Sequence, residues 1–251
     1  MENRIALQLF TLRDFLKTEA DIGKTLARVS ETGYRAVELA SLGPIDDKNL
    51  KDLLDQNRLE CMGMHIGLPA LQQDLEGLVK KMKTLKCPFA AIGGPPKEYR
   101  NREGFVKLAK EMEDFGKKFA DRGLRLGYHN HRFEFEKWFD KTAYEYLFDN
   151  TRHVWAELDC YWVQYGGADS AALIRKLKGR IAEVHLKDMT VRNDQPIMAE
   201  VGEGNIHWPG VIKACEESGV KRFVVEQDLC ERDPFESIRI SLNNLQKWGL
   251  K

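Results

Sequence analysis

Eight short apolar runs recur along the chain, and each is followed by a stretch whose apolar residues are spaced by three and four. Runs of this length fit buried strands, and the spacing that follows them fits helices that are apolar on one side. A regular alternation of strand and helix is typical of a parallel sheet with helical crossovers. We predict strands at residues 5–10, 36–39, 60–65, 89–92, 124–129, 153–158, 181–185 and 222–226.

Eight such units are the number that closes a barrel. The chain has 251 residues, 43% of them hydrophobic, which matches the roughly 250 residues of a typical eight-stranded barrel. We therefore expect one domain over residues 1–251 with the fold of a single (β/α)8 TIM barrel. The start of the last helix is also predicted, because Asp233 can cap it and Pro234 suits its first turn.

Composition narrows the possible partners. Thirty-nine basic residues balance thirty-nine acidic ones, and no lysine or arginine run forms a stripe. Nucleic acids and acidic membranes attract localised positive charge, so a small molecule is the better expectation. Five cysteines without C-x-x-C spacing, no basic and apolar leader, and no apolar stretch of about 20 residues indicate a cytoplasmic protein.

The predicted strands of the second half end on residues that can bind a metal or carry a proton. These residues are His129, His131 and Glu134, then Asp159, then His185, and finally Glu226. The C-terminal ends of the strands form one rim in a barrel of this kind, so these side chains should converge. Each of them alone would more often be structural, as a helix cap or a hydrogen-bonded histidine. A functional site is favoured because so many of these residues occur together at predicted strand ends.

A set of three carboxylates and one imidazole suits a divalent ion such as Mn²⁺, Mg²⁺, Co²⁺ or Zn²⁺. Such an ion could polarise a carbonyl and lower the cost of forming an enediolate, while a carboxylate or histidine removes the neighbouring proton. Further rim residues are expected to contact substrate, namely His65, His129, Trp162, Lys187 and Glu203 in the long connection 187–208. Lys187 could instead pair with Asp188, and Trp162 could be core.

The chain resembles the sugar phosphate isomerase/epimerase family of the xylose isomerase-like barrel superfamily. The resemblance covers nearly the whole chain, and its most specific segments are G-Y-H-N-H-R-F-E-F at 127–135, E-L-D-C-Y-W-V at 157–163, V-H-L-K-D at 184–188, V-G-E-G at 201–204 and V-V-E-Q-D at 224–228. It implies a single divalent ion, with Mn²⁺ favoured, held by Asp159, His185, Glu226 and one residue after the fifth strand.

That fifth-strand ligand is where the chain departs from the family, because many relatives read E-N-H where this chain reads H-N-H. Either His129 replaces the usual glutamate, or Glu134 supplies the carboxylate. Glu134 is favoured because it keeps the shell rich in oxygen, and His131 is then assigned to substrate or proton transfer. The expected catalytic residues are thus Glu134, Glu226 and His131.

The leading functional interpretation is a metal-dependent isomerase or epimerase of a sugar or polyol-derived ketone, and a homo-oligomer is compatible with it. A lyase or dehydratase acting on a keto-sugar or inosose is the alternative, because the same metal and base make the same enediolate. An endonuclease IV-like enzyme would need more metal ligands and a basic groove, and a non-catalytic sugar-binding barrel would not need an intact metal shell. Both are weaker interpretations.

Overall fold

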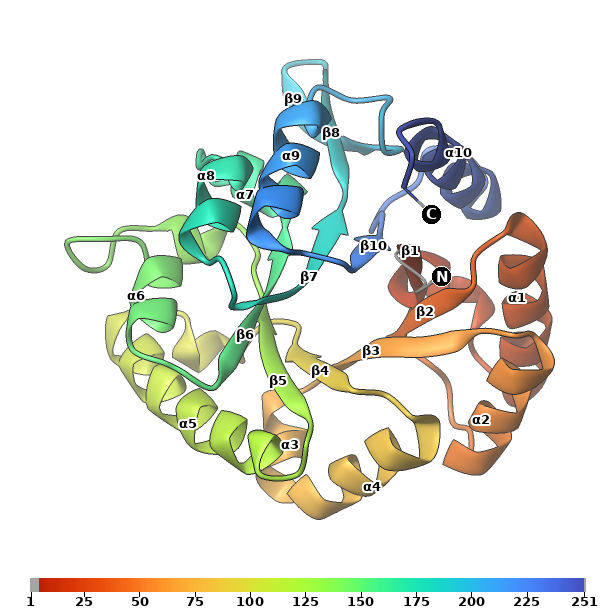
Figure 1. Cartoon of the computed structure of the whole chain (residues 1–251), viewed down its shortest axis with the longest axis horizontal. Coiled ribbons are helices and arrows are strands. Elements are labelled where there is room, and N and C mark those ends of the chain that lie inside the picture. Colours follow the sequence, from red (N-terminus) through yellow and green to blue (C-terminus); the bar gives the residue numbers. More distant parts are fainter. Residues whose placement is uncertain (1–4, 251) are drawn as a thin grey trace.

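The computed structural model describes residues 5–250, and in it eight parallel strands close into a barrel surrounded by helices (Figure 1). The barrel strands are β1 (Ile5–Gln8), β2 (Ala36–Leu39), β3 (Glu60–Ile66), β4 (Phe89–Ile92), β5 (Arg125–His129), β6 (Val154–Asp159), β7 (Ile181–Leu186) and β10 (Phe223–Val225). Their order around the barrel is β1, β2, β3, β4, β5, β6, β7, β10 and back to β1. The predicted fold is confirmed, and every predicted strand is present with its ends shifted by at most two residues.

Helices follow the strands and cover the outside of the barrel (Figure 1). The α-helices are α1 (Glu19–Thr32), α2 (Asp47–Gln56), α3 (Leu68–Gln73), α4 (Leu75–Leu85), α5 (Arg102–Ala120), α6 (Ala143–Asp149), α7 (Cys160–Tyr165), α8 (Ser170–Lys176), α9 (Trp208–Ser218) and α10 (Pro234–Lys247). Three short 3-10 helices are η1 (Leu9–Phe15), η2 (Lys97–Tyr99) and η3 (Phe133–Phe135). Asp233 caps α10 as predicted, since its side chain accepts from the amides of Phe235 and Glu236.

We expected an irregular loop in the long connection after β7, but this connection contains an antiparallel hairpin. Its strands are β8 (Asp188–Arg192) and β9 (Gln195–Ala199), joined by Asn193 and Asp194 with φ angles of 49° and 59°. Two consecutive residues with positive φ are the requirement of a tight hairpin turn whose twist matches that of its strands, and asparagine and aspartate tolerate this conformation. The hairpin stands at the edge of the barrel, beside α9 (Figure 1).

The interior of the barrel changes character along its axis. Small and apolar side chains fill the N-terminal part, including Ala6, Ala36, Met62 and Val224. Successive side chains of a strand point to opposite faces, so residues two positions apart share the interior. Two positions after Ala6, Ala36 and Val224 stand Gln8, Glu38 and Glu226, all buried. Charged and polar side chains therefore fill the C-terminal part.

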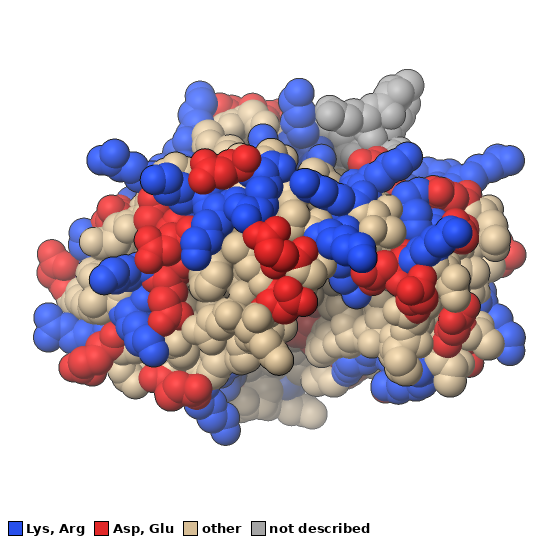
Figure 2. All heavy atoms as spheres, turned by 90° about the horizontal axis from the view of Figure 1, so that it is seen from below, with Lys and Arg blue, Asp and Glu red and all other residues tan. Residues whose placement is uncertain are grey.

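Acidic and basic side chains are intermixed on the outside of the barrel, over the face seen from below in Figure 2. This mixture agrees with the equal numbers of acidic and basic residues in the sequence. Binding of nucleic acid relies instead on a concentrated field of one sign.

Candidate metal centre

Four of the residues at the strand ends meet inside the C-terminal mouth of the barrel. His129, Asp159, His185 and Glu226 each place one possible ligand atom within 4.8 Å of the others, and all four are buried. Asp159 and His185 are level with each other on the adjacent strands β6 and β7. We call these four residues the rim group. The structure thus brings Asp159, His185 and Glu226 together.

The distances within the rim group are those of side chains around a common point. His129 Nε2 lies 3.3 Å from Asp159 Oδ2 and 3.9 Å from Glu226 Oε2, and His185 Nδ1 lies 3.0 Å from Glu226 Oε2. Two imidazoles and two carboxylates are a donor set that Mn²⁺, Zn²⁺, Fe²⁺ and Co²⁺ accept.

Neighbouring groups hold these side chains in place. Asp159 Oδ1 accepts from the amide of Trp162 at 3.0 Å, while His185 Nε2 lies 2.9 Å from Glu38 Oε2. A ligating histidine commonly donates its second ring N–H to a carboxylate, which fixes the tautomer and the ring orientation. His129 Nδ1 is buried and finds no hydrogen-bond partner in the described part of the chain, residues 5–250. The donor set and its supporting contacts fit a divalent ion.

Glu134 does not join the rim group, although it was our preferred fifth-strand ligand. Its Oε1 accepts from the Tyr128 hydroxyl at 2.7 Å, and its Oε2 accepts from the His131 amide at 2.8 Å. Burial raises the pKa of this carboxyl to about 8. Glu134 thus braces the turn that follows β5, and His129 stands where a carboxylate was expected. The backbone explains the exchange, because His129 is the last residue of β5 whereas Glu134 lies in η3.

The ammonium group of Lys187 lies among the acidic members of the rim group. Its Nζ is 2.8 Å from Glu226 Oε2, 3.1 Å from Asp159 Oδ2 and 3.1 Å from Asp228 Oδ1. Burial opposes the charged form of this lysine, but the attraction of the three carboxylates outweighs it and raises the pKa of Lys187. The alternative pairing with Asp188 is not what the structure shows.

A cavity of about 380 Å³ opens above the rim group. It is lined by Phe10, Arg13, His65, Gly93, His129, His131, Lys187, Glu226, Asp228 and Leu229. His65, His129, His131, Lys187 and Glu226 were predicted for the site, whereas Phe10, Arg13 and Leu229 were not. Leu229 is 70% exposed and Phe10 carries no polar side chain, so neither gave a chemical signal in the sequence.

The two histidines that line the cavity beside the rim group differ in charge. Burial and the nearby His129 lower the pKa of His131 to about 3, so its imidazole is neutral at ordinary pH. Burial also disfavours the charged form of His65, but Glu157, 2.6 Å away, and Glu38 raise the pKa of His65 to about 9. At neutral pH His65 can therefore donate a proton, whereas a pKa of about 3 makes His131 a weak base that can accept a hydrogen bond.

Two other expected substrate contacts have different positions. Trp162 packs beside the site, with Lys187 Nζ 5.5 Å from its ring centroid and the His131 ring 5.5 Å away. Glu203 is exposed, accepts a hydrogen bond from Asn244 at 3.4 Å and lines a separate pocket with residues such as Arg192 and Glu231. The structure therefore does not bring Glu203 to the cavity above the rim group.

The glycines around Glu203 have a structural reason. Asp188, fully buried, accepts hydrogen bonds from the amides of Gly202 and Gly204 and from the Trp208 indole. A Cβ on Gly204 would lie 2.3 Å from Asp188 Oδ1, so only glycine allows this approach. The V-G-E-G segment wraps the carboxylate of Asp188.

Fold and site together define a (β/α)8 barrel with a buried group of imidazoles and carboxylates, typical of a divalent metal site, at the C-terminal mouth. The family described as Xylose isomerase-like TIM barrel matches residues 26–248, and the chain belongs to this family. No helix within residues 5–250 has the length and apolar character needed to cross a membrane.

Solved structures resemble the chain over nearly its full length. A sugar phosphate isomerase/epimerase from Parabacteroides distasonis ATCC 8503 has a TM-score of 0.81 at 19% identity and covers 98% of both chains. D-allulose 3-epimerase from Methylomonas sp. has a TM-score of 0.71 at 15% identity, over 98% of this chain and 97% of the other. At these identities the likeness shows the fold.

Two curated relatives are inosose dehydratases. The protein from Clostridium beijerinckii is 25% identical over 158 residues, which are 56% of this chain and 53% of the relative. The protein from Mesomycoplasma hyopneumoniae is 25% identical over 215 residues, which are 74% of this chain and 69% of the relative. The chain thus aligns with about half the length of the first relative and about two thirds of the second.

Proposed function

We propose that this protein is a divalent-metal-dependent enzyme that isomerises or epimerises a small sugar or polyol-derived ketone by proton transfer next to a carbonyl. The observation that carries the proposal is the rim group of His129, Asp159, His185 and Glu226 at the base of a cavity of about 380 Å³. A volume of this size lies within the range of small-molecule sites.

The residues that would hold the ion are the four members of the rim group. The bound ion would supply a Lewis acid that stabilises negative charge on a substrate oxygen. Lys187 adds a fixed positive charge at the same place, with its ammonium 2.8 Å from Glu226. Negative charge that develops on a substrate in this cavity would therefore meet preorganised positive groups, which is the main way in which such sites lower a barrier.

Proton transfer falls to residues that line the cavity. His131 is neutral, and its buried Nδ1 has no hydrogen-bond partner among residues 5–250, so it can accept a hydrogen bond from a substrate hydroxyl. Glu226 reaches the same cavity with its carboxylate. We assign Glu226 to proton transfer, His131 and His65 to substrate binding, and Glu134 to positioning of His131 through the hydrogen bond to its amide.

Dehydration of a keto-sugar or inosose is the second candidate. It is favoured by His65, which lines the cavity and is held in its charged form by Glu157, since a charged imidazole can protonate a departing hydroxyl group. The curated inosose dehydratases are consistent with this outcome. Both reactions begin with removal of the same kind of proton, and they differ in whether a hydroxyl group then leaves.

A substrate panel in D₂O separates the two reactions. Ketoses, 3-keto-glycosides and inososes would be incubated with Mn²⁺-loaded protein and followed by mass spectrometry and NMR. Isomerisation or epimerisation gives a product of the same composition that has gained solvent deuterium, whereas dehydration gives a product that has lost water. Asp159→Asn, which removes one rim carboxylate, should abolish both. The proposal fails if the metal-stripped protein or Asp159→Asn is as active as the wild type, or if no member of the panel exchanges.

A further inference from the structure

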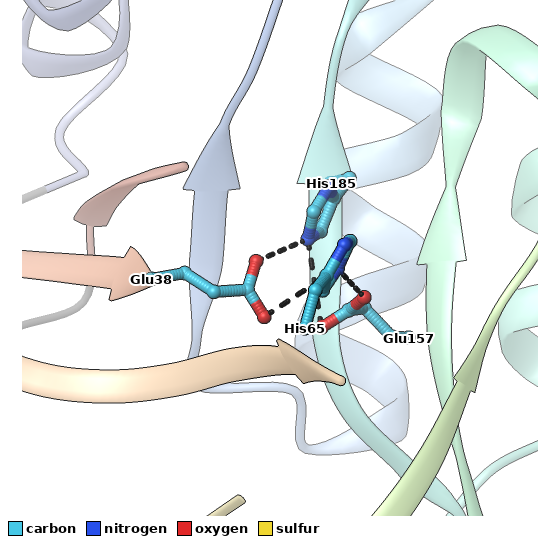
Figure 3. A group of neighbouring side chains, drawn as sticks. All are labelled: Glu38, His65, Glu157 and His185. Atoms are coloured by element: carbon cyan, nitrogen blue, oxygen red, sulfur yellow. Dashed lines mark hydrogen bonds and ion pairs between the residues drawn. The ribbon is translucent and has the colours of Figure 1, made fainter. Parts of the chain in front are cut away.

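We propose that the barrel holds a second divalent cation deeper in its interior, bound by Glu38, His65, Glu157 and the Nε2 atom of His185. The four residues come from β2, β3, β6 and β7 and point toward one another (Figure 3). Each offers one ligand atom, and these atoms lie within 4.8 Å of one another. This interior group shares His185 with the rim group but uses the other ring nitrogen, so with both ions bound His185 would bridge them as an imidazolate, having released both ring protons to solvent. His65 would then bind the ion as a neutral imidazole, and its role as a charged proton donor in dehydration holds only while the interior position is empty.

The candidate ligand atoms of the interior group are close enough to surround one small ion. Its atoms form a ring in which His65 Nε2 lies 2.6 Å from Glu157 Oε2 and 3.7 Å from Glu38 Oε1. His185 Nε2 lies 2.9 Å from Glu38 Oε2 and 3.6 Å from Glu157 Oε1. These contacts use both oxygens of each carboxylate. A tetrahedral ion with bonds of about 2.0–2.1 Å would need one oxygen of each to lie ~3.3–3.4 Å from its neighbours, which is within the range of these separations.

Two carboxylate oxygens of the interior group are left without a hydrogen bond. Both residues are completely inaccessible to solvent, and within residues 5–250 Glu38 Oε1 and Glu157 Oε1 have no hydrogen-bond partner. A buried carboxylate oxygen that lacks a partner costs free energy, so such atoms are expected to face a ligand. Gly63 contributes to the available space, because a Cβ there would lie 2.9 Å from Glu38 Oε1.

The charge of this layer points to a cation. Glu38, Glu157 and Glu183 are all fully buried, and the arginine of the layer, Arg222, pairs with Glu183 at 3.4 Å. The positive partners of Glu38 and Glu157 are imidazoles only, within residues 5–250. Buried carboxylates without a fixed positive partner are typical of positions that coordinate a metal.

A simpler explanation is that Glu38 only orients His185. Their contact is of the kind that fixes a ligating histidine, and Gln8 Nε2 also donates to Glu38 Oε2 at 2.7 Å. That explanation leaves Glu38 Oε1 and Glu157 Oε1, among residues 5–250, with ion-pair contacts of 3.7 and 3.6 Å but no hydrogen bond. The two explanations differ in the number of ions bound.

The test uses the whole chain, stripped of metal with a chelator and reloaded with Mn²⁺ or Zn²⁺ as the probe. Elemental analysis after gel filtration should give two ions per wild-type chain, and calorimetry should resolve two binding events. Glu157→Gln keeps the size of the side chain but removes its charge, and it should bind one ion, with affinity at the interior position reduced at least tenfold. Glu183→Gln is the matched control from the same layer and should still bind two.

A second measurement detects the pair of ions directly in the wild type. Two Mn²⁺ ions that share the imidazole of His185 should show a spin-coupled electron paramagnetic resonance spectrum in the wild type, and Glu157→Gln should show the spectrum of isolated Mn²⁺. Asp159→Asn should lose the rim ion and keep the interior one, which separates this proposal from the proposed function. One ion per wild-type chain with an uncoupled spectrum, or two ions retained in folded Glu157→Gln, would overturn the proposal.

Discussion

His129 Nε2 lies 3.3 Å from Asp159 Oδ2, across the neighbouring strands β5 and β6. This contact puts an imidazole into the rim group at the point where the resemblance to known barrels led us to expect a carboxylate. The rim group consequently offers two nitrogen and two oxygen donors, with one negative charge fewer than a set of three carboxylates and one imidazole. Lys187, with its ammonium among the remaining carboxylates, makes the net charge of the site still less negative.

We predict that Lys187 and the rim ion compete for the same carboxylates. Lys187→Met should destabilise the metal-free protein by about 3 kcal/mol, because Asp159, Glu226 and Asp228 lose a buried partner. The same change should raise the affinity for Mn²⁺ at least tenfold, or about 1.4 kcal/mol. Urea unfolding with and without Mn²⁺ measures both effects.

The control for this prediction is Lys141→Met, which removes a surface ion pair with Asp149. Exposed pairs contribute about 1 kcal/mol or less, and this variant should gain the same stabilisation from Mn²⁺ as the wild type. An equal response to Mn²⁺ in Lys187→Met and the wild type would show that the lysine does not compete.

Asp188 should hold the loop that leads into α9. In the wild type, hydrogen-bond donors contact both carboxylate oxygens of Asp188. Asp188→Asn keeps only one acceptor oxygen, so we expect the free energy of unfolding to fall by about 2–4 kcal/mol. Hydrogen exchange at the amides of Gly202 and Gly204 should speed up in the native state. Trp208→Phe removes only the indole donor and should leave these amides protected. Unchanged exchange in Asp188→Asn would contradict this role.

Glu145 should make the free energy of unfolding depend on pH in the acid range. The hydrogen bond from Lys176, followed by those from Thr142, outweighs burial and lowers the pKa of Glu145 from 4.5 to about 2. A carboxyl whose pKa is lowered by folding stabilises the folded state at pH values above its ordinary pKa. This stabilisation is lost as the pH falls from about 4.5 toward 2. Glu145→Gln should cost about 1 kcal/mol near neutral pH.

Urea unfolding of the wild type and Glu145→Gln between pH 6 and pH 3 tests this dependence. The difference between the two proteins should be constant at the upper end and should shrink below pH 4.5. A difference that stays constant down to pH 3 would mean that the capping box of α6 and the ion pair with Lys176 do not titrate as described.

The strand positions were predictable because periodicity is a local signal. Buried strands such as Phe89–Ile92 stand out as short apolar runs between turn residues. Because the strands are parallel, their C-terminal ends must then meet at the same mouth of the barrel. The hairpin of β8 and β9 was not predicted, although it too has a local signal in the sequence. The adjacent Asn193 and Asp194 are residue types that tolerate the positive φ angles of its turn.

The composition of the rim group was only partly predictable. The residues that could be predicted, Asp159, His185 and Glu226, each end an apolar run, so the strand places the side chain at the C-terminal mouth of the barrel. His129 and Glu134 lie five residues apart on either side of a turn. Which of them enters the rim group depends on where β5 ends and on the hydrogen bond that Glu134 accepts from the Tyr128 hydroxyl. Glu38 and Glu157 lie within strands, where the interior of the barrel rather than sequence pattern decides what they face.

Metal content of variants at the two competing positions after β5 tests the rim group without reference to any substrate. We predict that His129→Ala loses the rim ion, that His129→Glu keeps it, and that Glu134→Gln keeps it while losing activity, because Glu134 supports the turn carrying His131. Elemental analysis of the three proteins, each reloaded with Mn²⁺ and compared with the wild type, gives the answer. Loss of an ion from Glu134→Gln together with full retention in His129→Ala would contradict the rim group described above.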